Sequence, residues 1–128
     1  MIDVSRDDRV AVVTVDRQDA LNALDLPTLT ELRDRLRELA EDSGARVLIL
    51  TGAGDRAFVA GADIKYMSGL GVDEAKEWGA LGHEAGRLLE TMPKPTIAGL
   101  VNGVHDPVLD KARETAALLA SKSPVALR

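Results

Sequence analysis

The run Val47-Leu48-Ile49-Leu50-Thr51-Gly52 limits the possible folds of this chain more than any other stretch. It is short, dominated by aliphatic residues and followed by a glycine-rich segment, so we predict a strand over Arg46–Thr51. Apolar and polar residues do not alternate along it. A strand of this kind is buried on both faces, as in the sheets of α/β proteins, where helices cover both sides.

Three further segments are predicted as strands or strand partners. Arg9–Asp16 is short and rich in β-branched residues, which favours a strand. Ile2–Ser5 is expected to pair with it across the polar turn Arg6-Asp7-Asp8. Thr96–Val101 is predicted as another strand, and the turn signal Asn102-Gly103 follows it.

Apolar residues at helical spacing predict three helices. The first covers Leu26–Asp42, with Asp25 as its cap and Pro27 in its first turn. The second covers Val72–Met92; because three glycines weaken it, we expect it to be mobile or to pack closely on a neighbour. The third begins at Asp106-Pro107. The predicted apolar faces are Leu26, Leu29, Leu32, Leu36 and Leu39 in the first, Ala75, Trp78, Gly82, Ala85 and Leu89 in the second, and Val108, Leu109, Ala112, Ala116 and Leu119 in the third.

The alternation of strands and helices indicates an α/β layered fold, and 128 residues suffice for one domain. Acids and bases are interleaved with a net charge of −5, which argues against a nucleic-acid partner but leaves a phosphorylated ligand open. There is no cysteine, and two histidines are too few for a histidine-rich metal site. No membrane-spanning run or signal peptide is evident, so a cytoplasmic protein without a membrane partner is expected.

The segment after the predicted strand carries two glycine-rich patterns. Gly52–Ala57 matches G-x-G-x-x-A, but Phe58–Gly61 is a poor helix start, so a plain turn is favoured over a dinucleotide site. Ala60–Ile64 is poor in large side chains, and its backbone N–H groups could approach a ligand. Such groups can hold a carbonyl oxygen that gains negative charge. From the residues alone, a tight turn packed on the core is an equal alternative.

Three segments together resemble the enoyl-CoA hydratase/isomerase (crotonase) family. Arg17–Leu24 is similar to that family's early loop, R-P-x-A-L-N-A-L. Thr51–Lys65 is similar to its oxyanion and adenine-pocket segment, and Met92–Ala98 to the strand that leads to its second glycine cluster. The likeness runs in order from about Val10 to Ile97 and implies a truncated crotonase-like (ClpP/crotonase) spiral of ββα units.

The resemblance also implies an acyl-CoA substrate, no permanently bound cofactor and a homo-oligomer. The N–H of Ala62 would donate to the thioester carbonyl as the catalytic oxyanion group. The cofactor-binding residues would be Ala60, Ala62 and Ile64 around the adenine, Arg56 and Lys65 near the phosphates, and Ala20 and Leu21 over the pantetheine arm. Without the motif, both basic side chains would be taken as solvated surface charge. Gln18 and Asp19 depart from the family pattern, and an acid at position 19 would repel phosphate and weaken binding.

The second half of the family's active site is missing. In the family, V-N-G runs into a glycine cluster and a helix with a catalytic glutamate, whereas Val104–Pro107 follows here. We interpret residues 1–103 as joined, within a single domain, to a helix like the family's C-terminal portion over about 104–128. Losing one oxyanion donor costs roughly 10²–10³ in rate. The lost middle should also expose a sheet edge and apolar helix faces, which predicts self-association or marginal stability.

Histidine and acid pairs do not supply the missing groups. His83 and Glu84 fall away from the predicted apolar face, so solvated positions are expected, and Arg87 breaks the H-E-x-x-H zinc pattern. Asp106, beside His105, is better explained as a helix cap. Two hypotheses therefore stand: an enzyme that hydrates 2-enoyl-CoA to 3-hydroxyacyl-CoA in fatty acid metabolism, or an inactive remnant that binds coenzyme A or a full-length relative. A small nucleotide-binding domain is a third.

Overall fold

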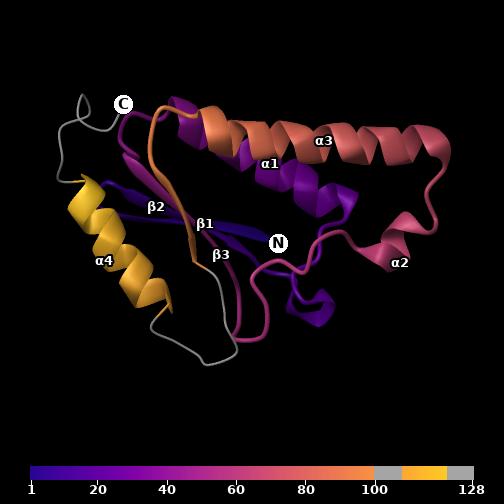
Figure 1. The fold of residues 1–128 in the computed structure, drawn as a ribbon, viewed down its shortest axis with the longest axis horizontal. Coiled ribbons are helices and arrows are strands. Elements are labelled where there is room, and N and C mark those ends of the chain that lie inside the picture. The colour runs from indigo at the N-terminus through magenta and orange to yellow at the C-terminus, as the bar shows by residue number, and fades with distance from the viewer. Residues whose placement is uncertain (100–107, 121–128) are drawn as a thin grey trace.

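The computed structural model describes residues 1–99 and 108–120, and within them a four-stranded sheet has helices on both faces (Figure 1). The strand order is β1-β2-β3-β4. β1 and β2 are antiparallel, whereas β2–β3 and β3–β4 are parallel. The strands are β1 (Ile2–Asp7), β2 (Val10–Val15), β3 (Val47–Gly52) and β4 (Thr96–Gly99). All four predicted strands are therefore present, and the last two residues predicted for β4 lie outside the described part.

The two central strands are buried on both faces, as the sequence predicts. Val47, Leu48 and Ile49 of β3 have no exposed surface. Side chains alternate between two apolar clusters because successive residues of a strand point to opposite faces. Leu48 and the odd-numbered residues of β2 face one cluster, while Val47, Ile49 and the even-numbered valines of β2 face the other.

Helix α1 (Leu26–Glu41) packs its leucine face on the first of these faces. Leu29, Leu32, Leu36 and Leu39 are all buried. The predicted cap is confirmed, since a side-chain oxygen of Asp25 accepts a hydrogen bond from the N–H of Thr28 at 2.9 Å. The spacing of three and four residues thus predicted both the helix and the side that it buries.

Helix α3 (Val72–Thr91) lies against α1 rather than directly on the sheet (Figure 1). Its buried residues are Leu81 and Ala85, with Trp78 partly buried, so the predicted face is confirmed at its centre. The prediction that Ala75 belongs to this buried face is wrong. Ala75 is exposed, because the first turns of α3 extend beyond α1 (Figure 1). Close packing is confirmed at Gly82, where an added Cβ would lie 3.7 Å from a Leu29 methyl carbon.

Helix α4 (Val108–Ala120) covers the opposite face of the sheet, so the described residues form three layers (Figure 1). Three alanines, Ala112, Ala116 and Ala120, are buried against the valines and isoleucine of β2 and β3. Small side chains bring the helix backbone close to the sheet. The predicted cap at Asp106-Pro107 lies outside the described residues.

The end of α1 is held by Lys94, which precedes β4. Its Nζ donates to the backbone carbonyl oxygens of Leu39 at 2.5 Å, Asp42 at 2.8 Å and Ala45 at 2.6 Å. Burial lowers the pKa of Lys94. A single ammonium thus satisfies carbonyls that a helix end leaves without intrahelical partners, and ties α1 to the strand that follows α3.

Candidate functional site

The predicted site loop begins at Gly52, where the chain folds back over the end of β3. A Cβ at Gly52 would lie 2.0 Å from the carbonyl oxygen of Phe58 and 2.6 Å from that of Ala57. No side chain fits there, because both contacts are with backbone atoms. The loop also uses positive φ values at Gly54 (80°) and Gly61 (90°), which glycine adopts at little cost. These glycines therefore define the loop's path.

Ala62 forms an isolated parallel bridge with Leu24, and its own N–H is directed away from that bridge. The N–H of Leu24 donates to the carbonyl of Gly61 at 2.8 Å, and the N–H of Asp63 donates to the carbonyl of Leu24 at 3.0 Å. Because N–H groups alternate along an extended chain, the Ala62 N–H points to the opposite side. No residue in the described ranges accepts a hydrogen bond from it. Ala62 as a residue is partly exposed, and its N–H is left without an acceptor among the residues that the structure describes.

The loop is pinned at its start by Asn22, which sequence reasoning did not select. Asn22 is 1% exposed and has a φ of 59°. Its Oδ1 accepts from the N–H of Arg17 at 2.8 Å, and its Nδ2 donates to the carbonyls of Ala53 and Ala57, each at 3.0 Å. One sequence signal could have identified Asn22: it lies in the family-like run Arg17–Leu24, and asparagine tolerates a left-handed backbone better than most residues.

Arg17 holds the other end of the loop and was also missed. Its guanidinium lies 3.2 Å from a carboxylate oxygen of Asp63 and 3.4 Å from one of Asp25, and it donates to the carbonyl of Ala23. The other Asp63 oxygen accepts from the N–H of Tyr66 at 3.2 Å and caps the short helix α2 (Ile64–Met67). One guanidinium therefore sits between the caps of α1 and α2.

Several of the predicted coenzyme A residues lie together. The N–H of Ala60 donates to the carbonyl of Leu21 at 3.1 Å, so the early loop and the oxyanion segment run side by side. Leu21 follows a 3₁₀ turn (Gln18–Ala20) that the sequence did not predict. Leu21 is 39% exposed and Ile64 is 79% exposed. Ala20 is half-buried in the same turn.

The two predicted phosphate-binding cations are both on the surface of this region. Arg56 lies in the loop and Lys65 in α2, and both side chains are exposed. In the described part of the chain neither forms an ion pair. Their exposure fits either solvated charge or phosphate contact, so the ligand role stays a prediction.

Asp63, which follows Ala62 in the chain, is already engaged. The N–H of Tyr66 and the Arg17 guanidinium lower the pKa of Asp63, against the opposing effect of burial. Glu84 keeps 37% of its side-chain surface exposed, in line with the predicted solvated position, and it forms ion pairs with Arg33 at 2.9 Å and with Arg37 of α1. Its ion pairs place it on the α1 side of α3, next to Ala85. His83 is exposed as predicted, and the pair His105-Asp106 lies outside the described residues.

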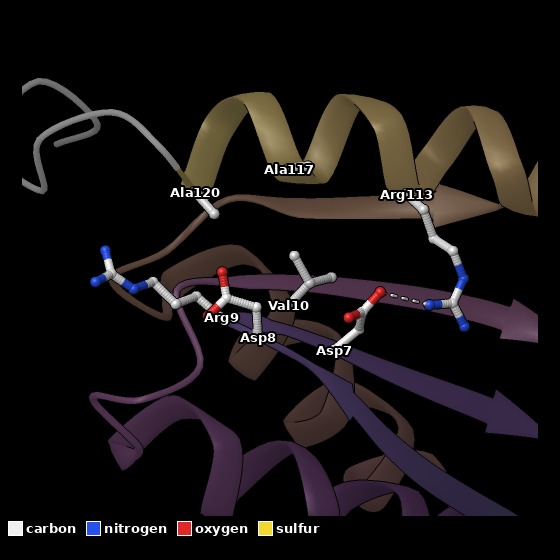
Figure 2. Close-up of a pocket in the computed structure, with 7 residues that line it drawn as sticks. All are labelled: Asp7, Asp8, Arg9, Val10, Arg113, Ala117 and Ala120. Carbon is white, nitrogen blue, oxygen red and sulfur yellow. Dashed lines mark hydrogen bonds and ion pairs between the residues drawn. The ribbon is translucent and has the colours of Figure 1, made fainter.

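Two cavities among the described residues lie away from Ala62. One, of about 340 Å³, lies between α4 and the β1–β2 turn. Asp7 and Arg113, which both line it, form an ion pair at 3.4 Å (Figure 2). The other, of about 510 Å³, is an open hollow on the exposed side of α1. In residues 1–99 and 108–120, no acidic or histidine cluster is arranged to hold a metal ion, and no helix could cross a membrane.

Comparison with known proteins identifies the family. The family model described as enoyl-CoA hydratase/isomerase matches residues 5–106. The chain is 45% identical over 100 residues to a crotonyl-CoA hydratase of Syntrophomonas wolfei, and equally to a short-chain-enoyl-CoA hydratase of Clostridium acetobutylicum. Each match covers 78% of this chain and 38% of the relative. The chain therefore belongs to the enoyl-CoA hydratase/isomerase family and spans well under half the length of these relatives.

Solved structures agree with the sequence matches. An enoyl-CoA hydratase from Bacillus anthracis superposes with a TM-score of 0.74 at 33% identity, covering 78% of this chain and 39% of that one. One from Mycobacterium smegmatis gives 0.73 at 31% identity, covering 77% and 39%. The predicted fold class, a shortened crotonase-like α/β fold, is confirmed. The junction that we place near residues 103–104 stays a prediction.

Proposed function

We propose that this chain binds acyl-CoA thioesters, with the Ala62 N–H donating to the thioester carbonyl. The observation that carries the proposal is the amide of Ala62, which has no acceptor within residues 1–99 and 108–120 and stands next to a bridge that satisfies its neighbours. A fixed donor of this kind favours an oxygen that carries more negative charge. Family membership supports the same ligand, because the two relatives described above are named as hydratases of coenzyme A thioesters.

The surface around Ala62 has the chemistry for the rest of such a ligand. Leu21 and Ile64 offer exposed aliphatic surface for an acyl or pantetheine chain. Arg56 and Lys65 offer exposed cations for phosphate that form no ion pair with the described residues, and the sequence's overall charge of −5 makes local cations more important for an anionic ligand. Asp19 is exposed on the neighbouring turn and should reduce affinity for phosphates.

Hydration of 2-enoyl-CoA is the second candidate, and the names of the relatives favour it. Hydration needs a group that moves a proton to or from water. The carboxylate nearest in sequence to Ala62, that of Asp63, is held ionised by Tyr66 and Arg17. A carboxylate with a lowered pKa is a weak base, so we propose binding as the first function and hydration as the second. Self-association, cytoplasmic location and the absence of a permanent cofactor stay predictions.

The test is a comparison of binding with turnover. Calorimetric titration of acetyl-CoA should show binding to the wild-type chain, whereas the 2-enoyl absorbance of crotonyl-CoA should stay constant. NAD and ATP serve as controls for a nucleotide-binding domain. Absence of acetyl-CoA binding would refute the proposal, and steady loss of crotonyl-CoA absorbance would establish the hydratase instead.

A further inference from the structure

We propose that Arg17 is a positioning residue that fixes the direction of the Ala62 N–H by holding Asp63, the next residue in the chain. The proposal deepens the function proposed above and rests on it only for the effect on a ligand. Arg17 lies far from Ala62 in sequence, and its main-chain N–H serves the same loop through Asn22. Both ends of the segment Ala53–Asp63 thus depend on residues 17–22.

The geometry places one guanidinium nitrogen between two carboxylates. Nη2 of Arg17 is 3.2 Å from Oδ2 of Asp63 and 3.4 Å from Oδ2 of Asp25, and all three side chains are only 17% exposed. Each aspartate uses its other oxygen to cap a helix. The guanidinium is fixed further by the carbonyl of Ala23. Because it is tied to the buried helix α1, it transmits that rigidity to the site loop.

The consequence for Ala62 follows from the peptide chain. The Ala62 N–H lies in the Gly61–Ala62 peptide, whose carbonyl accepts from the N–H of Leu24 at 2.8 Å, and the next peptide is fixed by the bond from the Asp63 N–H to the carbonyl of Leu24 at 3.0 Å. The Asp63 side chain, held by Arg17 and Tyr66, keeps this residue in its cap conformation, with φ −75° and ψ 101°. Releasing that side chain would let residues 60–63 rotate and would change where the Ala62 N–H points.

Two matched substitutions separate positioning from general stability. Asn caps helices nearly as well as Asp, so Asp63→Asn and Asp25→Asn each keep a cap and remove one ion pair with Arg17. Only Asp63→Asn acts next to Ala62. Arg17→Lys keeps the positive charge but loses the planar set of guanidinium donors. Its effect should lie between those of Asp63→Asn and Asp25→Asn. Arg33→Lys, in the α1–α3 ion pairs, is the control for losing a guanidinium of similar exposure elsewhere.

The first measurement needs no ligand. Hydrogen exchange of the Leu24 and Asp63 amides, followed by nitrogen-15 NMR, should be about threefold to tenfold faster in Asp63→Asn, as expected for loss of one charge-assisted bond. Core amides such as that of Ile49 should not change. Asp25→Asn and Arg33→Lys should leave the loop amides at wild-type rates. Equal effects of Asp63→Asn and Asp25→Asn, or no effect of either, would overturn the positioning role.

The second measurement is titration with acetyl-CoA and with free coenzyme A, which lacks the thioester carbonyl. Asp63→Asn should weaken acetyl-CoA binding about threefold to tenfold and leave free coenzyme A binding unchanged, since only the thioester uses the Ala62 N–H. An equal loss for both ligands would overturn the proposal, because a merely structural effect would not distinguish them. If the wild-type chain binds neither ligand, the proposed function fails, while the exchange rates still decide the role of Arg17.

Discussion

Replacing Asn22 with alanine tests whether one buried amide holds the site loop together. The side chain makes three hydrogen bonds, at 2.8, 3.0 and 3.0 Å, with residues before and after β3. Each is worth about 1 kcal/mol, and leaving its partner buried without a replacement costs at least as much. Alanine at a φ of 59° adds about 1 kcal/mol more. Asn22→Ala should therefore destabilise the protein by about 4 kcal/mol.

Glycine at position 22 separates the cost of the lost hydrogen bonds from the cost of the left-handed backbone. Asn22→Gly loses the same hydrogen bonds but accepts the left-handed backbone, so it should be up to about 1 kcal/mol less destabilising than alanine. Gln18→Ala is the matched control: this amide lies on the same turn, is exposed and, among the described residues, bonds only to Asp16 at 3.2 Å. Its effect should stay within about 0.5 kcal/mol.

Urea unfolding followed by far-ultraviolet circular dichroism and by the fluorescence of the single tryptophan, Trp78, gives these values. The midpoints should shift while the slopes stay constant. Total stability of a domain is about 5–15 kcal/mol, so the shift for Asn22→Ala is a large fraction of it. A loss under about 1 kcal/mol with an unchanged slope would refute the reasoning that these three bonds hold the loop.

Three further predictions concern other parts of the molecule. Lys94→Met should cost about 2 kcal/mol in urea unfolding, because three carbonyls lose a charged donor and those of Leu39 and Asp42 keep only a backbone N–H, whereas the same change at the exposed Lys76 should be neutral. Gly52→Ala should cost more than about 3 kcal/mol because its Cβ would meet backbone at 2.0 Å, whereas Gly86→Ala, with open space around it, should stabilise α3 by up to about 1 kcal/mol. Because the folded-state pKa of Asp63 is lowered, its contribution to stability is complete above about pH 4 and is lost as the pH falls through that lowered pKa. The amide signals of α2 should follow this loss in nitrogen-15 spectra, and Asp63→Asn should abolish it.

The sheet and the long helices could be predicted from sequence because their signals are local. Unbroken aliphatic residues in β3 and leucines at helical spacing in α1 each bury surface against any suitable neighbour. The details of α3 were less predictable. Ala75 and Leu81 differ little in local pattern, and which of them is buried depends on where α1 begins, because Gly82 already lies beside Leu29 of the first turn of α1. The ion pairs of Glu84 with Arg33 and Arg37 were equally hard to predict, because they depend on how α1 and α3 lie side by side.

The short elements around the site could not be predicted because they depend on distant contacts. A four-residue helix such as α2 has almost no stability of its own. Its existence depends on Asp63 and Arg17, which are brought together only by the fold. Motif reasoning selected residues that would touch a ligand, such as Ala62, and passed over the buried pair Arg17 and Asn22 that hold them. Their low exposure is visible only in three dimensions.

The guanidinium shared by two helix caps has an evolutionary consequence. If a neutral residue replaces Arg17, two half-buried carboxylates face each other without a counter-charge, so selection should remove that change unless an aspartate changes with it. Positions 17, 25 and 63 should therefore vary as a correlated set among homologous sequences. Independent drift at any one of them would mean that the three charges do not depend on one another.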